Sequence, residues 1–346
     1  MRSLRVSRRQ FATAALAFGA TASEVWAQRD APPHVTLLTG INIAGLEFSP
    51  EQNPGRLGTD YVAPEPREIE YYRERGMNVI RVPFLWERLQ PRLDGPFDAS
   101  YFALLRNAVR HSGDLHVILD AHQYGRRQVN GEAHIIGESA TVTADHFADF
   151  WAMLADRFAA NDNVIFGLQN EPHDQDTNTL VSVQNRAIAA IRDAGARNLI
   201  LVSGNAWSGA HSWMSSGNAE AMLRIEDPAD NFAFDVHQYL DSASSGAQPE
   251  CAIGSGARLA EFSRWCRTHG KRGFLGEFGA GAGRLCLHEL SDLLQHIADN
   301  GAVWIGWTYW AGGAWWPDDY PLSVRPQSLT EPSDRPQMSV LRRYLR

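Results

Sequence analysis

The chain alternates between short apolar segments and longer amphipathic segments along most of its 346 residues. The apolar segments have the length and residue types of buried strands, and the amphipathic segments have the period of helices. We expect strands at residues 37–43, 77–82, 115–120, 198–203, 231–236, 272–278 and 302–307, and one more that begins at residue 164 and ends on Asn170 and Glu171. We expect helices at residues 66–75, 100–111, 143–159, 177–194, 257–269, 287–299 and 336–344.

This alternation favours an α/β fold in which eight parallel strands form a (β/α)8 TIM barrel, as a single domain over residues 36–346. Such barrels routinely take about 250 residues or more as one unit, so the length fits. The alternative is an open, doubly wound sheet. That fold would place a glycine-rich phosphate-binding turn after the first strand, and residues 40–45 (GINIAG) do not form one.

Residues 1–27 have the features of an export signal. A basic start is followed by an apolar run, residues 11–22, that is too short to span a bilayer, and Ala27 suits cleavage. The run SRRQF at residues 7–11 resembles the twin-arginine motif, which implies a periplasmic or secreted bacterial protein. An ordinary Sec signal is the alternative. Residues 28–35 form a short tether, and we expect no membrane anchor after processing.

The charge of the chain argues against nucleic acid and anionic membranes as partners. The formal net charge is −8, and residues 1–27 carry four arginines and one glutamate, so the processed chain is more acidic still. A neutral or cationic partner fits this balance. Nothing in the sequence suggests an obligate protein partner, and we expect a monomer.

Three cysteines allow at most one internal disulfide in an oxidising compartment. Cys251 and Cys286 both fall in predicted loops, whereas Cys266 lies in a helical segment among apolar residues and is expected in the core. We therefore predict a Cys251–Cys286 bond. The spacing of the three is not that of a zinc site.

Polar and aromatic residues follow the ends of the predicted strands. Because the carboxyl ends of parallel barrel strands open onto one mouth, these side chains should gather there. They are Arg81, Asp120, His122, Tyr124, Asn170, Glu171, Asn205, Trp207, Trp213, His237, Tyr239, Glu277, Tyr309, Trp310, Trp315 and Trp316. Pro172 should end the ladder after Glu171 and hold that residue in an extended conformation.

Glu171 and Glu277 end two different strands, so their carboxyl groups can flank one bond. Hydrolysis of a glycosidic bond needs a proton for the leaving oxygen and a carboxylate at the anomeric carbon. Aromatic rings can stack on sugars, and the neighbouring guanidinium of Arg81 can keep one carboxylate ionised. No Gly-x-Ser-x-Gly nucleophile elbow is present. A retaining mechanism would place the two carboxyl groups about 5 Å apart.

These residues resemble glycoside hydrolase family 5, and within it the subfamily 5 endo-β-1,4-glucanases. The matching pieces are residues 40–45 (GINIAG), 78–83 (NVIRVP), 119–122 (LDAH), 170–172 (NEP), 236–241 (VHQYLD) and 275–277 (LGE). The resemblance extends over residues 36–345. It implies a secreted retaining endo-β-1,4-glucanase, that is, a cellulase that acts on β-glucan polysaccharides or oligosaccharides without a metal or other cofactor.

The resemblance also implies a role for each matched residue. Glu171 would be the general acid/base and Glu277 the nucleophile, with Arg81 and Tyr239 beside Glu277. Asn170 would bond the hydroxyl next to the attacked carbon, while His122 and His237 shape the cleavage site. Trp310 would be a sugar platform, and the family's cysteines after strands six and seven match Cys251 and Cys286. From the sequence itself, Trp207 is expected either to stack on sugar in an outer subsite or to pack in a loop.

Several alternatives stay open at this point. A β-mannanase, a xyloglucanase, a mixed-linkage glucanase or a transglycosylase would share the same catalytic core. A non-catalytic glycan-binding barrel would be expected to lack one of the two glutamates, and both are present. Asp120 and His122 could begin a metal site, because a D-x-H pair on one strand faces one side. No third ligand is evident, so we expect no metal and assign Asp120 a supporting hydrogen bond.

Overall fold

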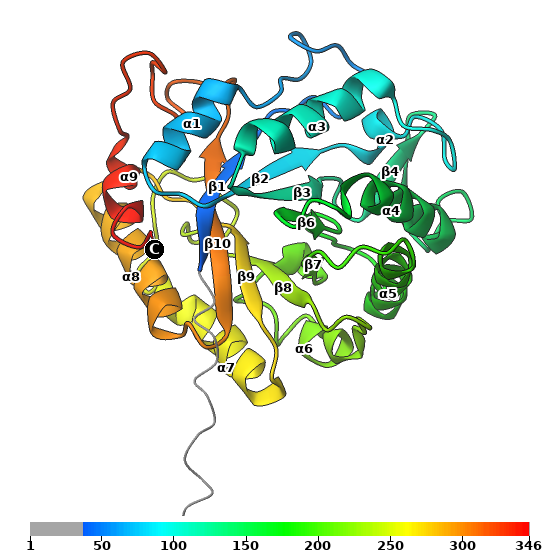
Figure 1. Ribbon diagram of the computed structural model, residues 1–346. Helices are drawn as coiled ribbons and strands as arrows, with labels where there is room; N and C mark the ends of the chain where they lie inside the picture. Colours follow the sequence, from blue (N-terminus) through cyan, green and yellow to red (C-terminus); the bar gives the residue numbers. More distant parts are fainter. Residues whose placement is uncertain (1–36, 346) are drawn as a thin grey trace, which may run out of the picture. The chain divides into compact units, whose positions relative to one another are not determined.

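A computed structural model describes residues 37–345 and shows a closed barrel of eight parallel strands. The strands follow one another around the barrel in the order β1-β10-β9-β8-β7-β6-β3-β2 (Figure 1). They are β1 (Leu38–Ile43), β2 (Val79–Phe84), β3 (His116–Ala121), β6 (Val164–Gly167), β7 (Ile200–Ser203), β8 (Phe232–His237), β9 (Gly273–Glu277) and β10 (Trp304–Gly312). The predicted (β/α)8 barrel is confirmed, and the open sheet was the wrong alternative.

Helices surround the barrel, and at least one follows each barrel strand (Figure 1). They are α1 (Pro66–Glu74), α2 (Trp86–Leu89), α3 (Ala99–Ser112), α4 (Ala144–Phe158), α5 (Thr177–Asp193), α6 (Asn218–Ala221), α7 (Ala260–His269), α8 (Arg284–Asp299) and α9 (Pro336–Leu341). Short 3-10 turns are η1 (Ala206–Ser208), η2 (Met222–Arg224) and η3 (Gly256–Leu259). The seven predicted helices are all present, although the one expected at 257–269 is divided between η3 and α7.

Three of the helix starts, those of α3, α4 and α5, are fixed by side chains that accept backbone N–H groups. Thr143 accepts from the N–H of His146, whose ring bonds back to the N–H of Thr143, which makes a capping box at α4. Asp98 and Asp176 cap α3 and α5 in the same way, through the N–H groups of Tyr101 and Thr179. These bonds satisfy donors that an uncapped helix would leave open at its first turn.

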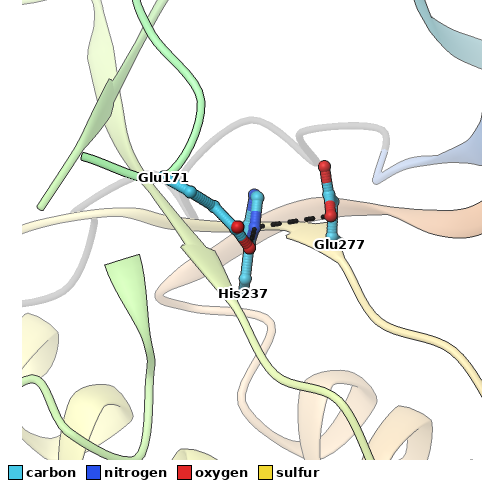
Figure 2. A group of neighbouring side chains, drawn as sticks. All are labelled: Glu171, His237 and Glu277. Carbon is cyan, nitrogen blue, oxygen red and sulfur yellow. Dashed lines mark hydrogen bonds and ion pairs between the residues drawn. The ribbon is translucent and has the colours of Figure 1, made fainter. Parts of the chain in front are cut away.

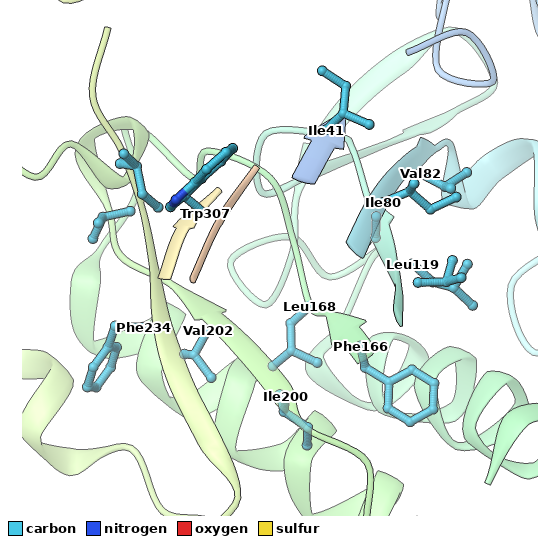
Figure 3. Close-up of a cluster of buried hydrophobic side chains, with 14 of the residues drawn as sticks. Ile41, Ile80, Val82, Leu119, Phe166, Leu168, Ile200, Val202, Phe234 and Trp307 are labelled. Carbon is cyan, nitrogen blue, oxygen red and sulfur yellow. The ribbon is translucent and has the colours of Figure 1, made fainter. Parts of the chain in front are cut away.

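Two apolar layers hold the barrel together. One residue from each barrel strand fills the interior, and together they form a plug: Leu38, Val79, Ile118, Ile165, Leu201, Ala233, Phe274 and Ile305. A larger cluster lies between the strands and the helices, and Figure 3 shows part of it. There Phe166 contacts Trp151 of α4, and Phe234 contacts Trp265 of α7. The plug closes the interior, so polar side chains further along the strands have access to solvent only at the mouth.

The loop after β3 contains a hairpin that we did not predict. Strands β4 (Arg126–Val129) and β5 (Glu132–Ile135) pair antiparallel around Asn130 and Gly131, which have φ of 53° and 84°. Asn-Gly at this position is the signature of a two-residue hairpin turn, so the signal was present in the sequence. It was missed because residues 126–128 (RRQ), before the turn, are all polar and show no apolar alternation.

The predicted disulfide is present between Cys251 and Cys286, whereas Cys266 is a buried free thiol. Cys286 was expected in a loop, but it lies in the first turn of α8, because that helix begins three residues earlier than predicted.

We expect the Cys251→Ser, Cys286→Ser double variant to lose stability. The bond closes a loop with a sequence separation of 35, for which chain entropy predicts a stabilisation of about 3 to 4 kcal/mol. Equilibrium unfolding in urea measures the free energy directly. A Cys266→Ser variant, which removes a thiol without opening a loop, is the control for the loss of sulfur itself. Equal losses in both variants would contradict the assignment.

The predicted export signal, residues 1–27, and the predicted tether, residues 28–35, lie outside the described residues. Within residues 37–345, no helix combines the length and the apolar character that crossing a bilayer requires.

Candidate active site

The polar layer of the site sits directly above the apolar plug because side chains alternate along a strand. Residues two positions apart face the same side. Arg81, Asp120 and Asp235 each lie two residues beyond a plug residue of their own strand, so they point into the barrel toward its mouth. All three are at most 2% exposed.

Glu277 reaches the same face through a bulge in β9. The register of β8 with β9 shifts between Val236 and His237, so that Val236 pairs with Leu275 but His237 pairs with Glu277. Without this extra residue, the side chain of Glu277 would point away from the interior. Gly276 permits the bulge, because a Cβ there would lie 2.1 Å from Oδ1 of Asp235.

The carboxylate of Glu277 is held by two donors. Nη1 of Arg81 donates to its Oε1 at 2.7 Å, and the hydroxyl of Tyr239 donates to its Oε2 at 2.7 Å. Burial alone would raise the pKa of Glu277, but the charges of His237 and Arg81 hold this pKa well below its usual range. Glu277 is therefore ionised at neutral pH, as a nucleophile must be.

Glu171 follows β6 and bonds to His237 of β8. Figure 2 shows the side chains of Glu171 and His237 pointing toward each other, and Oε1 of Glu171 lies 2.7 Å from Nδ1 of His237. The expected extended conformation of Glu171 was wrong, because its φ is 42°, in the left-handed region. The restriction before Pro172 acts mainly against the right-handed helical region, so it does not dictate the extended one. The bond to His237, and one from the N–H of Trp207 to the carbonyl of Pro172, hold the turn in place.

The two glutamates and His237 form a compact group. One atom from each, a carboxylate oxygen of Glu171, a ring nitrogen of His237 and a carboxylate oxygen of Glu277, lies within 4.8 Å of the others. Nδ1 of His237 is also 3.6 Å from Oε2 of Glu277. This spacing fits the separation of about 5 Å that a retaining glycosidase uses, and it leaves no room for the extra water of an inverting one.

His237 is positively charged at neutral pH. Burial opposes the charge, but Glu277 and Glu171 together raise the pKa of His237 from 6.5 to about 9. A metal ion would need this ring deprotonated. By distance alone the three side chains could supply metal ligands, whereas in this structure Nδ1 of His237 forms a hydrogen bond with Oε1 of Glu171.

We expect the ionisation of His237 to appear in the stability of the protein. Because the pKa of His237 is raised in the folded state, the contribution of its charge to the free energy of unfolding is complete below pH 6.5 and is lost as the pH rises through about 9. The shift corresponds to about 3 kcal/mol. Urea unfolding of wild type and His237→Gln should therefore differ more at pH 6 than at pH 10. Glu277 stays ionised throughout this range and does not interfere. A difference that does not change with pH would contradict the charge assignment.

A network below the glutamates fixes their positions. Nη2 of Arg81 donates to Oδ1 of Asn170 at 2.7 Å and lies 3.0 Å from Oδ1 of Asp120. Asp120 in turn bonds Nδ1 of His122 at 2.9 Å, as expected for a supporting residue. Burial works against a charge on His122, but Asp120 raises its pKa. The other ring nitrogen of His122 lies 3.3 Å from the amide of Asn170.

Two residues of this network, Asn42 and Asp235, were not assigned a role from the sequence. Oδ1 of Asn42 accepts from Arg81 at 2.8 Å, and its amide donates to the carbonyls of Gly276, Thr308 and Tyr309. Burial raises the pKa of Asp235 to about 6, although His237 and Arg81 oppose this. Asn42 could have been found, since it is a polar residue near the end of an apolar strand like the others.

Aromatic rings line the cleft above the glutamates, which has a volume of about 630 Å³. Trp310 stacks on His122 with centroids 5.7 Å apart, and its indole N–H donates to the hydroxyl of Tyr320. Trp207 is 50% exposed and stacks on His173 at 4.5 Å. The cleft also contains Tyr124, Tyr239 and His211, of which His211 had not been predicted.

Other residues of the expected set lie elsewhere. Trp213 is fully buried and packs on Phe234, Phe262 and Trp265. Asn205 bonds to the loop before α5 and to Asn218. Trp316 stacks on Tyr320 and lines a neighbouring cavity. These positions separate the sugar-facing candidates from residues that pack the loops.

Comparison with known proteins gives consistent matches. Residues 38–313 match the family model "Cellulase (glycosyl hydrolase family 5)". Endo-beta-1,4-glucanase A of Emericella nidulans is 38% identical over 296 residues, which cover 84% of this chain and 87% of that protein. Endo-beta-1,4-glucanase B of Aspergillus niger is 36% identical over 311 residues, or 88% of this chain and 89% of that protein.

Solved structures agree with these sequence matches. An endo-beta-1,4-glucanase from Xanthomonas axonopodis pv. citri is 42% identical, with a TM-score of 0.85 over 90% of this chain and 100% of that chain. XacCel5A in complex with cellopentaose is 40% identical, with the same TM-score and coverage.

Proposed function

The chain belongs to glycosyl hydrolase family 5, and it is an endo-β-1,4-glucanase for which we propose a double-displacement mechanism. The observation that carries the proposal is the pair of glutamates. Glu277 is ionised and held by Arg81 and Tyr239, while Glu171 lies opposite it and bonds to His237. One ionised carboxylate and one proton carrier at this spacing are what retention of configuration requires.

In the first step, a carboxylate oxygen of Glu277 attacks the anomeric carbon. Glu171 gives its proton to the glycosidic oxygen as the bond to that oxygen breaks, so the leaving sugar departs as a neutral alcohol. The product is a glycosyl ester on Glu277. In the second step, Glu171 takes a proton from water, the water oxygen attacks the same carbon, and the ester bond to Glu277 breaks. Two inversions leave the configuration unchanged.

The surrounding residues support these steps by position and charge. Asn170 is held by Arg81, so its amide is placed to bond the hydroxyl adjacent to the attacked carbon. His237 keeps a proton beside Glu171. The rings of Trp310 and Trp207 both line the cleft that contains the glutamates, and each can serve as a platform for a sugar. His122 supports Trp310 from beneath.

The substrate we propose is a β-1,4-glucan that the processed enzyme meets outside the cytoplasm as a monomer. XacCel5A, which this chain resembles, was solved with cellopentaose. A twin-arginine signal at residues 1–27 would export the folded enzyme. Replacing Arg8 and Arg9 by lysine should then leave a reporter fused behind residue 27 in the cytoplasm, whereas export that is unchanged would indicate the Sec route.

The test of the function is hydrolysis of soluble polymers. Carboxymethyl-cellulose and mixed-linkage glucan should lose viscosity early, when few reducing ends have formed, because cuts fall within the chain. β-Mannan should react poorly. Cleavage of mannan alone would be consistent with the proposed mechanism but would show that the substrate is a mannan and not a glucan. If the folded protein bound glucan but released no reducing ends, a glycan-binding barrel would be favoured. Activity lost with EDTA would indicate a metal-dependent hydrolase.

A further inference from the structure

The loop that follows β10, residues 313–325, supports the ring of Trp310. The indole N–H of Trp310 donates to the hydroxyl of Tyr320 at 3.1 Å, and its ring meets that of Trp316 edge-on, with centroids 6.0 Å apart. Trp316 in turn stacks on Tyr320 at 4.2 Å and donates its indole N–H to the carbonyl of Gly312. The position of the Trp310 ring in the cleft therefore depends on where this loop lies.

A buried carboxyl group on α1 contacts both ends of the loop. Oε1 of Glu68 accepts the N–H of Gly313, the first residue of the loop, at 2.8 Å. The same oxygen lies 3.7 Å from Nε of Arg325, the last residue of the loop. The side chain of Glu68 is only 1% exposed, although α1 lies on the outside of the barrel (Figure 1). One oxygen atom of α1 thus ties down the segment that supports Trp310.

Two glycines allow the end of β10 to come this close to α1. A Cβ on Gly312 would lie 2.5 Å from the hydroxyl oxygen of Tyr72, which is also on α1. A Cβ on Gly313 would lie 2.3 Å from the carbonyl oxygen of Ala44, and the φ of Gly313 is 119°, which other residues rarely adopt. The close approach places the N–H of Gly313 within reach of Glu68.

The hydrogen bond to Gly313, and not the ion pair with Arg325, is the main link. A separation of 3.7 Å from Arg325 is too long for a hydrogen bond. Burial raises the pKa of Glu68 to about 7, although the N–H of Gly313 and the charge of Arg325 oppose this. Near neutral pH the carboxyl group is therefore neutral in a large fraction of the molecules. Both of its forms can accept an N–H, and so can the amide of a glutamine.

We propose that Glu68 is a positioning residue for the reaction: by holding Gly313, it keeps Trp316 and Tyr320 against Trp310 and so keeps the Trp310 ring in place in the cleft. Glu68 acts from outside the barrel and through Trp310 alone. The inference rests on the proposed function, because it takes Trp310 as a platform for a sugar.

The test is a double-mutant cycle between Glu68 and Trp310. Glu68→Met keeps the length of the side chain and removes both acceptors, whereas Glu68→Gln keeps one. The matched control is Glu289→Met, because Glu289 is also a buried carboxyl group on a helix and ties down a different loop through the N–H groups of Gly254 and Ser255. The measured quantity is kcat/KM on cellopentaose for each variant, with and without Trp310→Ala, at a temperature where all are folded.

We expect Glu68→Met to lower kcat/KM about tenfold when Trp310 is present and less than twofold when Trp310→Ala is combined with it, on the scale of one lost hydrogen bond. Glu68→Gln should keep wild-type kcat/KM. Any loss in Glu289→Met should be the same with and without Trp310→Ala. If Glu68→Met does not fold, Glu68→Asp replaces it in the cycle, because it withdraws the carboxyl group from Gly313 by one methylene without adding bulk.

A second measurement reports the position of Trp310 without activity. In enzyme labelled with 5-fluorotryptophan, the fluorine NMR signal of Trp310 is identified by its loss in Trp310→Ala. Glu68→Met should shift this signal, and Glu289→Met should not.

Equal losses of kcat/KM with and without Trp310→Ala overturn the inference, because Glu68 would then act on the fold as a whole. An unchanged Trp310 signal in Glu68→Met overturns it too, as does a loss in Glu68→Gln as large as that in Glu68→Met. If Trp310→Ala by itself leaves kcat/KM unchanged, the platform role of Trp310 in the proposed function is wrong instead.

Discussion

Glu277→Gln should lower kcat on soluble glucan by about four orders of magnitude or more, the scale of loss when a covalent nucleophile is removed. The amide keeps the shape, its carbonyl oxygen can still accept from Arg81 and its NH2 can donate to the hydroxyl oxygen of Tyr239, but it cannot form the glycosyl ester. Substrate binding should survive, because the platforms Trp310 and Trp207 are unchanged. Reducing-end release measures kcat, and the quenching of tryptophan fluorescence by cellopentaose measures binding.

The control is Glu289→Gln. Glu289 is as buried as Glu277, but it lies on α8 away from the cleft, where it accepts the N–H groups of Gly254 and Ser255. This variant should keep wild-type kcat at a temperature where it is folded. If Glu277→Gln retained more than a few per cent of activity, a different nucleophile would be required.

Glu171→Ala should separate the two chemical steps. On glucan, the variant lacks the proton for the leaving sugar and should lose about 10²- to 10⁴-fold in kcat. On an aryl cellobioside with a dinitrophenyl leaving group, the first step needs no proton and should stay fast. The second step still needs a base, so the glycosyl-enzyme accumulates and turnover slows after a burst.

Added azide should restore turnover of the aryl cellobioside by Glu171→Ala, because this anion attacks the glycosyl-enzyme without a base. The product should be the β-configured glycosyl azide. In His237→Gln, which keeps Glu171, azide should have no effect, and this comparison isolates the carboxyl group itself. An α-azide, or no rescue, would contradict the assignment of Glu171 as the acid/base.

The barrel and the mouth of the site could be predicted because both follow from local patterns. Apolar strands alternating with amphipathic helices favour a parallel barrel, and in a barrel the polar residues at strand ends, such as Arg81 and Glu171, share one edge. The resemblance to glycoside hydrolase family 5 added the separate roles of the two glutamates, Glu171 as the acid/base and Glu277 as the nucleophile. These signals are contained within single segments, so no knowledge of long-range packing was needed.

What could not be predicted depends on contacts between segments. The bulge that turns Glu277 inward appears only when β9 is paired with β8, and the bridging position of His237 depends on where Glu171 lies. The left-handed backbone of Glu171 is held by contacts from the end of β8 and from η1.

The most direct test of the whole account is the configuration of the first product. Proton NMR of cellopentaose during the first minutes of hydrolysis, before mutarotation, reports the anomer at the new reducing end. Double displacement through Glu277 and Glu171 predicts that the β-anomer appears first and the α-anomer grows in slowly. If the α-anomer appears first, the reaction inverts, and the assignment of Glu277 as a covalent nucleophile is wrong.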